Sequence, residues 1–179
     1  MTENKSEARR GVIIDRLADH VLQHGLIAAS LRPLAKAAAT SDRMLLYYFS
    51  DKAEIIGATL QRIAERMTII LAARSAQTPL PLEQLTSQLT AMVLEEQFWP
   101  YMCVWLELAS RAARGDPLYV PIASAIGAGF LAWGEAQLDS ANPDARSREA
   151  ATLLIRVEGS VMVKAIGMRA TVELTQTQT

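Results

Sequence analysis

The chain has 179 residues, half of them hydrophobic and 21% charged, with a formal net charge of −1. This length and this apolar content exclude a disordered chain, because they are sufficient for a packed core. The single cysteine, Cys103, excludes a framework of internal disulfides and favours a reducing compartment.

The charge is unevenly distributed. The slightly acidic total argues by itself against a nucleic-acid partner. However, residues 1–62 contain nine Lys or Arg against seven Asp or Glu, whereas residues 63–179 contain nine against twelve. The N-terminal part is therefore the better place for a site that binds an anion.

No targeting or membrane segment is expected. The first ten residues are polar and no apolar run follows them, so they do not form a signal peptide. The uncharged run 117–133 is interrupted by Pro117 and Pro121, and the rest is shorter than the roughly 20 residues that a membrane helix needs. We expect a cytoplasmic protein with no membrane partner.

Apolar residues recur at helical spacing along the whole chain, and no segment alternates like a half-buried strand. The predicted fold class is therefore all-α. The first helix is expected over about residues 7–24, with Gly25 at its C-terminal stop.

Two short helices are expected next. Ser30 is a suitable N-cap for the first of them, and Pro33 falls in its first turn, where a missing N–H breaks no helical bond. Thr40-Ser41 ends this helix and caps another one over about residues 42–49.

Five longer helices complete the predicted fold. Asp51 caps the first of them, which links the two halves of the chain. Thr78-Pro79-Leu80-Pro81 is the clearest break, since two prolines this close cannot continue a helix. The others are expected over residues 82 to about 100, 101–114, 121–138 and 145–169, and the polar tail from Thr171 is expected to fray.

Two short helices joined by a tight turn are unusual in a bundle and are typical of a helix-turn-helix. The segment reads LRPLAKAAA-TS-DRMLLYYF. The start of the second helix of this motif enters the major groove of DNA, so its first residues should be polar. Its later residues, here Leu45, Leu46 and Phe49, should be apolar enough to pack.

The residue types suggest which groups would contact DNA. The predicted base-reading residues are Asp42, Arg43 and Met44: arginine can donate two hydrogen bonds to guanine, aspartate can accept from cytosine N4, and methionine can contact a thymine methyl. Ser41, polar and directly after the turn, is a further DNA-contact candidate. The predicted phosphate-binding residues are Ser30, Tyr47, Tyr48 and Lys52. Lys52 also lies at a helix N-terminus, which favours an anion, although Asp51 beside it repels one.

The segment GLIAASLRPLAKAAATSDRMLLYYFSDKAEII resembles the DNA-binding domain of the tetracycline-repressor (TetR) family of bacterial transcriptional regulators. Its most telling parts are the Gly25 turn, Leu34-Ala35 with Ala38, and LLYYF followed by Ser50-Asp51-Lys52. WLEL and VEGS in the second half are similar to the family's ligand-binding and dimerisation domain. This chain differs from the usual family pattern at three positions. It has Ala39 where the family commonly has glycine, Leu46 where many members have tyrosine, and Tyr48 where histidine is frequent.

The resemblance implies an N-terminal three-helix DNA-binding domain over residues 1–50 and a larger C-terminal helical domain over residues 51–179 for ligand binding and dimerisation. It also implies a homodimer that binds a palindromic operator in double-stranded DNA. A repressor of this kind releases its operator when a small-molecule effector binds. No cofactor is expected.

The second half is rich in aromatic and methionine side chains, which together with the resemblance indicate a pocket for a hydrophobic or aromatic effector. The predicted lining residues are Met67, Met92, Trp99, Met102, Trp105, Glu107, Phe130 and Trp133, with Glu95, Arg111 and Glu158 as further polar candidates. The alternative is that these aromatic residues fill a core. Glu107 and Arg111, four residues apart, would then pair with each other.

Other functions have less support. His20 and His24 are spaced to share a metal ion, but no third ligand stands at a useful spacing, so no metal is predicted. No nucleophile–base pair or phosphate loop supports catalysis, and an enzyme is not expected. The alternatives are a helical enzyme or small-molecule carrier that binds no DNA, and an activator or ligand-independent regulator.

Overall fold

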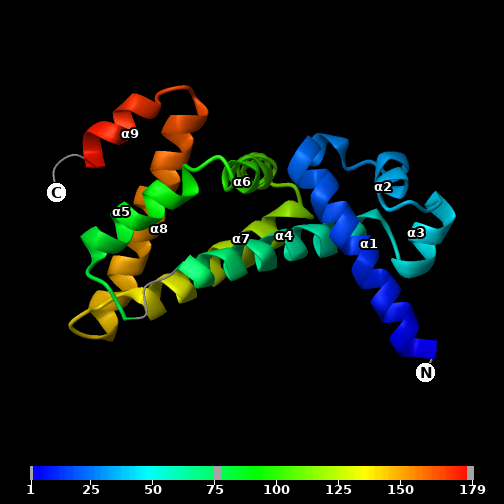
Figure 1. Cartoon of the computed structure of the whole chain (residues 1–179), viewed down its shortest axis with the longest axis horizontal. Helices are drawn as coiled ribbons and strands as arrows, with labels where there is room; N and C mark the ends of the chain where they lie inside the picture. Colours follow the sequence, from blue (N-terminus) through cyan, green and yellow to red (C-terminus); the bar gives the residue numbers. More distant parts are fainter. Residues whose placement is uncertain (1, 75–77, 177–179) are drawn as a thin grey trace. The chain divides into compact units, whose positions relative to one another are not determined.

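A computed structural model describes residues 2–74 and 78–176, without the side chains of residues 2–5 and 175–176. Over these ranges the chain is helical and has no strand, so the all-α prediction is confirmed (Figure 1). The helices are α1 (Thr2–His24), η1 (Leu26–Ala28), α2 (Leu31–Ala37), α3 (Asp42–Tyr48), α4 (Lys52–Arg74), α5 (Leu82–Val93), α6 (Trp99–Ala113), α7 (Tyr119–Gln137), α8 (Pro143–Ala165) and α9 (Arg169–Gln176).

Side-chain caps define three of the helix starts. Ser41 Oγ accepts a hydrogen bond from Met44 N at 3.2 Å, and Asp51 Oδ1 accepts one from Glu54 N at 2.8 Å. Asn142 does the same for Ala145 N at 2.9 Å. The predicted caps at Ser41 and Asp51 are thus confirmed, whereas Ser30 occupies the N-cap position of α2 without a side-chain bond.

The prediction of one helix from residue 82 to about residue 100 is wrong. α5 ends at Val93, and the turn that follows closes through hydrogen bonds such as Phe98 N to Glu95 O at 3.1 Å. α6 then begins at Trp99, so Pro100 lies in its first turn, where no intrahelical donor is lost.

The C-terminal prediction is also wrong. α8 ends at Ala165, and Gly167 reverses the chain with a φ of 85°, a conformation that favours glycine. The tail expected to fray from Thr171 instead continues as α9 to Gln176, because Val172, 3% exposed, is buried. Residues 177–179 of that predicted tail lie outside the described residues.

The chain forms two compact units. The first comprises residues 1–70 and 103–123, and the second comprises residues 71–102 and 124–179. These units differ from the expected functional division at residue 50, which stays a prediction because compactness and function are separate criteria. In the part of the chain that the structure describes, no helix is long and apolar enough to cross a membrane.

The core of the first unit includes the inner faces of α1 to α4, and Figure 1 shows α1 crossing α4 beside α2 and α3. Its buried residues include Ile13, Leu17, Val21, Leu26, Leu34, Leu45, Phe49, Ile55 and Leu60. Arg16 on α1 donates to Ala38 O at 3.0 Å, which satisfies a carbonyl at the C-terminus of α2. Burial and capping together hold the two short helices on α1.

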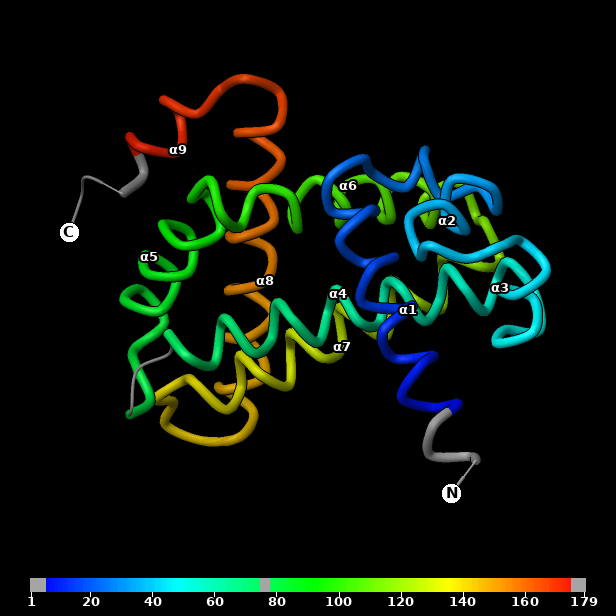
Figure 2. Tube along the Cα trace, turned by 45° about the vertical axis from the view of Figure 1, so that its right-hand side comes forward, coloured from blue at the N-terminus to red at the C-terminus, as the bar shows by residue number. Residues whose placement is uncertain are grey.

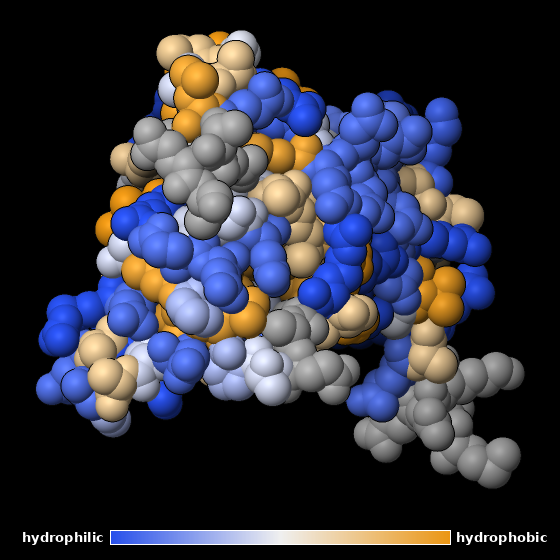
Figure 3. Space-filling view, turned by 60° about the vertical axis from the view of Figure 1, so that its left-hand side comes forward, coloured by the Kyte–Doolittle hydropathy of each residue, from blue (hydrophilic) through white to orange (hydrophobic). Residues whose placement is uncertain are grey.

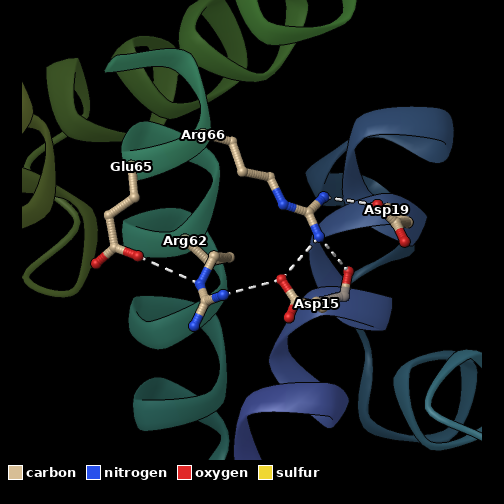
Figure 4. Close-up of polar contacts among 5 residues, drawn as sticks. All are labelled: Asp15, Asp19, Arg62, Glu65 and Arg66. Atoms are coloured by element: carbon tan, nitrogen blue, oxygen red, sulfur yellow. Dashed lines mark hydrogen bonds and ion pairs between the residues drawn. The ribbon is translucent and has the colours of Figure 1, made fainter. Parts of the chain in front are cut away.

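Two arginines of α4 bind carboxylates of α1 (Figure 4). Arg66 reaches Asp19 at 2.6 Å and Asp15 at 2.8 Å, and Arg62 reaches the same oxygen of Asp15 at 3.0 Å. Burial opposes the charge on Arg66, but its hydrogen bonds to Asp19 and Asp15 outweigh burial and raise its pKa. These contacts tie α1 to the long helix α4.

A second polar contact ties α6 to the end of α1. Glu107 Oε2 accepts a hydrogen bond from Leu26 N at 2.8 Å, directly after Gly25. Gly25 has a φ of 76°, and a Cβ at this position would overlap the Glu107 carboxylate. The chain therefore needs glycine here for its backbone conformation and for the close approach of Glu107.

The second unit is built around α5 and α8, which lie side by side in Figure 2. Leu153, Val157 and Val161 of α8 are buried at spacings of four. Lys164 donates to Leu94 O at 2.7 Å, and its ammonium lies 3.7 Å from the centroid of the Trp99 ring. A residue of α8 thus caps the C-terminus of α5 and fixes the turn into α6.

Replacing Gly25 tests the two demands made at residue 25 together. Gly25 combines its φ of 76° with a ψ of 174°, a region that essentially only glycine adopts and that costs other residues about 1–3 kcal/mol. Losing a hydrogen bond to a charged group costs about 1.5–3 kcal/mol more. We expect Gly25→Ala to lower the free energy of unfolding in urea more than Gly115→Ala does, since nothing lies within 4 Å of a Cβ added at Gly115. Equal losses would contradict these demands.

Candidate nucleic-acid interface

The turn between α2 and α3 is a Schellman motif. Thr40 N donates to Ala35 O at 3.0 Å and Ala39 N donates to Lys36 O at 3.1 Å, which satisfies carbonyls at the end of α2. Ala39 adopts a φ of 51°, at the position where the resemblance predicts glycine. Alanine in this left-handed conformation costs about 1 kcal/mol, so the motif keeps its geometry at some expense in stability.

α3 presents most of its surface outside the core. Leu45 and Phe49 are buried, as predicted for the packing side of this helix. The predicted base-reading residues, Asp42, Arg43 and Met44, are all exposed, and so is Ser41 before them. The expectation that Leu46 packs is wrong: its side chain is 46% exposed, because it lies about 100° around the helix from the buried Leu45.

The predicted phosphate-binding residues belong to the same unit. Ser30, Tyr47 and Lys52 are exposed, and Tyr48 is half-buried. The rings of Tyr47 and Tyr48 meet edge to face, with their centroids 5.3 Å apart. All eight predicted DNA-contacting residues thus lie on α3 or at the residues that open α2, α3 and α4. Their contacts with DNA stay predictions.

The start of α4 holds its acidic groups in internal contacts. Glu54 accepts from Ser50 N at 2.7 Å, from Ser50 Oγ at 2.9 Å and from Arg10 at 2.7 Å. The bonds from the backbone and side chain of Ser50, followed by that from Arg10, lower the pKa of Glu54 although burial opposes them. Asp51 Oδ1 accepts a hydrogen bond from the backbone N–H of Glu54, so this N–H is not free to bind a phosphate.

Two cations remain available at this surface. Within the described ranges, neither Arg43 nor Lys52 forms an ion pair with another side chain. Both are exposed, and each can donate to an acceptor outside the protein. An exposed helix with an unpaired arginine near its N-terminus, followed by a helix that begins with a second cation, can bind a polyanion and read acceptors in a groove.

The residues predicted to line an effector pocket are divided between the two units. Met67, Trp105 and Glu107 belong to the first unit, whereas Met92, Trp99, Met102, Phe130 and Trp133 belong to the second. The rings of Phe130 and Trp133 lie 5.9 Å apart. Glu107 binds Leu26 N, and Arg111 lies over the Tyr119 ring at 5.1 Å. The pocket stays a prediction.

The second unit contains an open groove of about 490 Å³ between α5, α8 and α9. Hydroxyl groups and an ion pair line much of it, including Thr86, Thr90, Ser160 and the bridge from Arg156 to Glu83 at 2.7 Å. None of the eight predicted pocket residues lines this groove.

The two histidines of α1 lie close together, with ring centroids 4.7 Å apart. Burial, and then the neighbouring charge of His24, lower the pKa of His20, although a backbone hydrogen bond at Ala28 opposes them. Among residues 2–74 and 78–176, no group of three or more potential metal-binding side chains comes together.

Sequence reasoning missed several residues that shape this surface. Leu46 stands three residues after Arg43, so helical periodicity alone places it beside that arginine rather than beside Leu45. Arg16 carried no local signal, because its partner Ala38 lies 22 residues away. The partner of Glu107, Leu26, lies 81 residues away.

No model of a known protein family matches the chain, and no curated protein matches it. Solved structures do. A transcriptional regulator from Rhodococcus sp. Rha1 matches with a TM-score of 0.70 and 26% identity, over 90% of this chain and 86% of that chain. A TetR-family transcriptional regulator from Rhodococcus sp. matches with a TM-score of 0.67 and 18% identity, over 89% and 88%.

GusR from Salmonella enterica matches with a TM-score of 0.63 and 15% identity, over 95% of this chain and 94% of that chain. The matches cover nearly the whole length of both partners, so they concern the complete helical arrangement and not the short motif alone. The two Rhodococcus proteins are described as transcriptional regulators, the class of protein expected for this chain.

The two serine N-caps provide a matched pair of substitutions. Ser41 Oγ accepts from Met44 N, whereas Ser30 makes no capping bond. Removing a working N-cap costs about 1 kcal/mol. We expect Ser41→Ala to lower the free energy of unfolding in urea by about this amount, and Ser30→Ala to lower it clearly less. An equal effect of both would show that the Ser41 cap does not stabilise α3.

Proposed function

We propose that this chain, which has the fold of TetR-family transcriptional regulators, is a DNA-binding transcriptional regulator with α3 as its recognition helix. The observation that carries the proposal is the exposed, unpaired Arg43 at the start of α3, directly after the helix-turn-helix turn. The compact unit around it includes α1, α2 and most of α4. Its site of action is proposed to be the cytoplasm.

The size and chemistry of α3 suit the major groove. An α-helix with its side chains is about 10–12 Å across, which fits the roughly 12 Å width of the groove. Arg43 donates two hydrogen bonds to guanine O6 and N7, Asp42 accepts from cytosine N4, and Met44 contacts a thymine methyl. Ser30 and Lys52 lie outside the helix, Tyr48 is its last residue, and all three bind phosphates.

We propose a homodimer in which the outer face of α8 meets a second copy. Ile155, Gly159 and Met162 follow one another at spacings of four and three, which places them on one side of the helix, and Ile166, the residue after its end, continues this spacing. Ile155 and Gly159 also line the open groove described above. Ile155, Met162 and Ile166 are 71%, 52% and 63% exposed. In Figure 3, apolar residues drawn in orange break the polar surface of the second unit. Such a stripe is self-complementary across a twofold axis.

A twofold dimer would present two recognition helices to successive major grooves, about 34 Å apart, and so would bind a palindromic operator. The proposed role is that of a repressor that a small hydrophobic or aromatic effector releases. The aromatic and methionine residues predicted to line the pocket suggest this class of effector.

The contacts of α4 and α6 support a route for this response. α4 runs without a break from Lys52 to Arg74 and holds α1 through Arg62 and Arg66. α6 reaches the end of α1 through Glu107. A displacement of either helix would therefore be passed to α1, and from there to α2 and α3.

A randomised duplex library tests the proposal. The purified chain should select a palindromic sequence, and its affinity should fall steeply with salt. Arg43→Ala should weaken binding to the selected duplex by about 1–3 kcal/mol and relax the preference at one base pair. Lys52→Ala should weaken all sequences alike and lower the salt slope by about 1.

Arg146→Ala, which changes an exposed arginine of the second unit, is the control and should leave binding unchanged. If the library yields no sequence while the protein retains a small molecule, the alternative of a carrier or enzyme without DNA binding is correct.

The α8 stripe yields a test of the dimer. Met162→Asp would place two carboxylates near the twofold axis, which opposes association, so we expect a monomer in sedimentation velocity and weaker binding to the palindrome. Ile69→Asp is the matched control, because Ile69 is 68% exposed on α4, outside the stripe. Dimerisation of Met162→Asp to the same extent as Ile69→Asp would contradict the proposed interface.

A further inference from the structure

The exposed side of α3 carries more apolar surface than charge. Leu46 and Tyr47 stand three and four residues after Arg43, so the three side chains are neighbours on the helix surface. Tyr47 is 74% exposed and Leu46 is 46% exposed, and Met44 beside them is 40% exposed. The helix holds one acidic and one basic residue, Asp42 and Arg43, whose charges cancel.

The core of the unit does not need these apolar side chains. Leu45 and Phe49 already fill the packing side of α3, at 0% and 2% exposure. Leu46 and Tyr47 therefore lose nothing by facing a partner, and they gain by being covered. On the proposed function, that partner is the floor of the major groove. The only apolar group that a natural base pair of unmodified DNA displays there is the thymine methyl.

We infer that Leu46 and Tyr47 read thymine methyl groups next to the guanine that Arg43 contacts. This inference rests on the proposed function and makes it more specific: the half-site contains a guanine flanked by thymines. It also gives Tyr47 a role different from the phosphate contact expected from its hydroxyl. Its position next to Arg43 on the outer side of the helix places the ring, rather than the hydroxyl alone, toward the bases.

Tyr48 keeps the role of a phosphate donor. It is half-buried, and its ring meets Tyr47 edge to face at 5.3 Å, which restrains both rings. Successive helical positions point about 100° apart, so the two adjacent tyrosines contact different parts of the DNA. Tyr47 faces the groove, and Tyr48 faces its edge.

Uracil provides the decisive probe, since it differs from thymine only by the methyl group. The full chain is first used to select a duplex from a randomised library, and each thymine of the selected half-site is then replaced by deoxyuridine. Burying one methyl favours binding about fourfold, so we expect a loss of about this size at the contacted positions. Leu46→Ala and Tyr47→Ala should each abolish the thymine-over-uracil preference at one position.

Phenylalanine substitutions separate ring contact from hydrogen bonding. Tyr47→Phe should keep both the affinity and the thymine-over-uracil preference, because the ring remains. Tyr48→Phe, the matched control, should weaken binding to all sequences alike and leave the preference unchanged. Leu46 and Tyr47 are exposed, so these variants should retain the wild-type unfolding midpoint, which confirms that each is folded.

The outcomes distinguish this inference from the proposed function. If the chain selects a sequence but binds its uracil form equally well, or if Tyr47→Phe loses as much affinity as Tyr47→Ala, the inference is overturned and the proposed function stands. If the chain selects no sequence, both are overturned. The same methyl occurs on 5-methylcytosine, so a methylated-cytosine duplex is tested in parallel. If affinity rises for the methylated-cytosine duplex but does not fall for the uracil duplex, the assignment to thymine is contradicted.

Discussion

The position of the helix-turn-helix depends on how α1 is held against α4. Arg62 and Arg66 lie one turn apart on α4, and both reach Asp15. Arg66 also binds Asp15 O at 3.1 Å, so the contact involves the backbone of α1 as well as its side chains. Because these groups share acceptors, α1 can roll on α4 only by breaking several hydrogen bonds together. Arg16 of α1 donates a hydrogen bond to Ala38 O at the end of α2, so the position of α2 depends on that of α1.

The first unit has a second such connection at the other end of the motif. The carboxylate of Glu107 enters the space left by Gly25 and binds the next backbone N–H. α4 and α6 thus hold α1 at different points, and both are charged contacts with short hydrogen bonds. In the proposed role, these contacts would favour one orientation of α1, and of α2 and α3 with it.

The fold was predictable wherever its signals are local. The caps at Ser41 and Asp51 act over three residues, so a short segment of sequence contains all the information. The end of α5 was not predictable, because Leu94 is capped by Lys164, 70 residues away. α9 was missed for a similar reason. Its sequence is mostly polar, and the burial of Val172, which stabilises the helix, arises only in the folded unit.

The same distinction applies to the candidate site. Residues next to the predicted turn could be chosen by chemistry alone, and the exposed position of Leu46 follows from helical periodicity once the packing side is known. The predicted pocket depends on how distant helices pack, and composition does not determine that. Glu107 illustrates the difference, since it was selected as a polar group for a ligand and it binds a backbone amide.

The cancelling charges of Asp42 and Arg43 have a consequence for behaviour in a cell. Attraction to arbitrary DNA comes mostly from cations that neutralise phosphates, and α3 contributes no net positive charge to it. In the proposed role, retention on the many competing sites of a genome would therefore depend on cations outside α3, such as Lys52. α3 itself would add a preference for one sequence without adding to that retention.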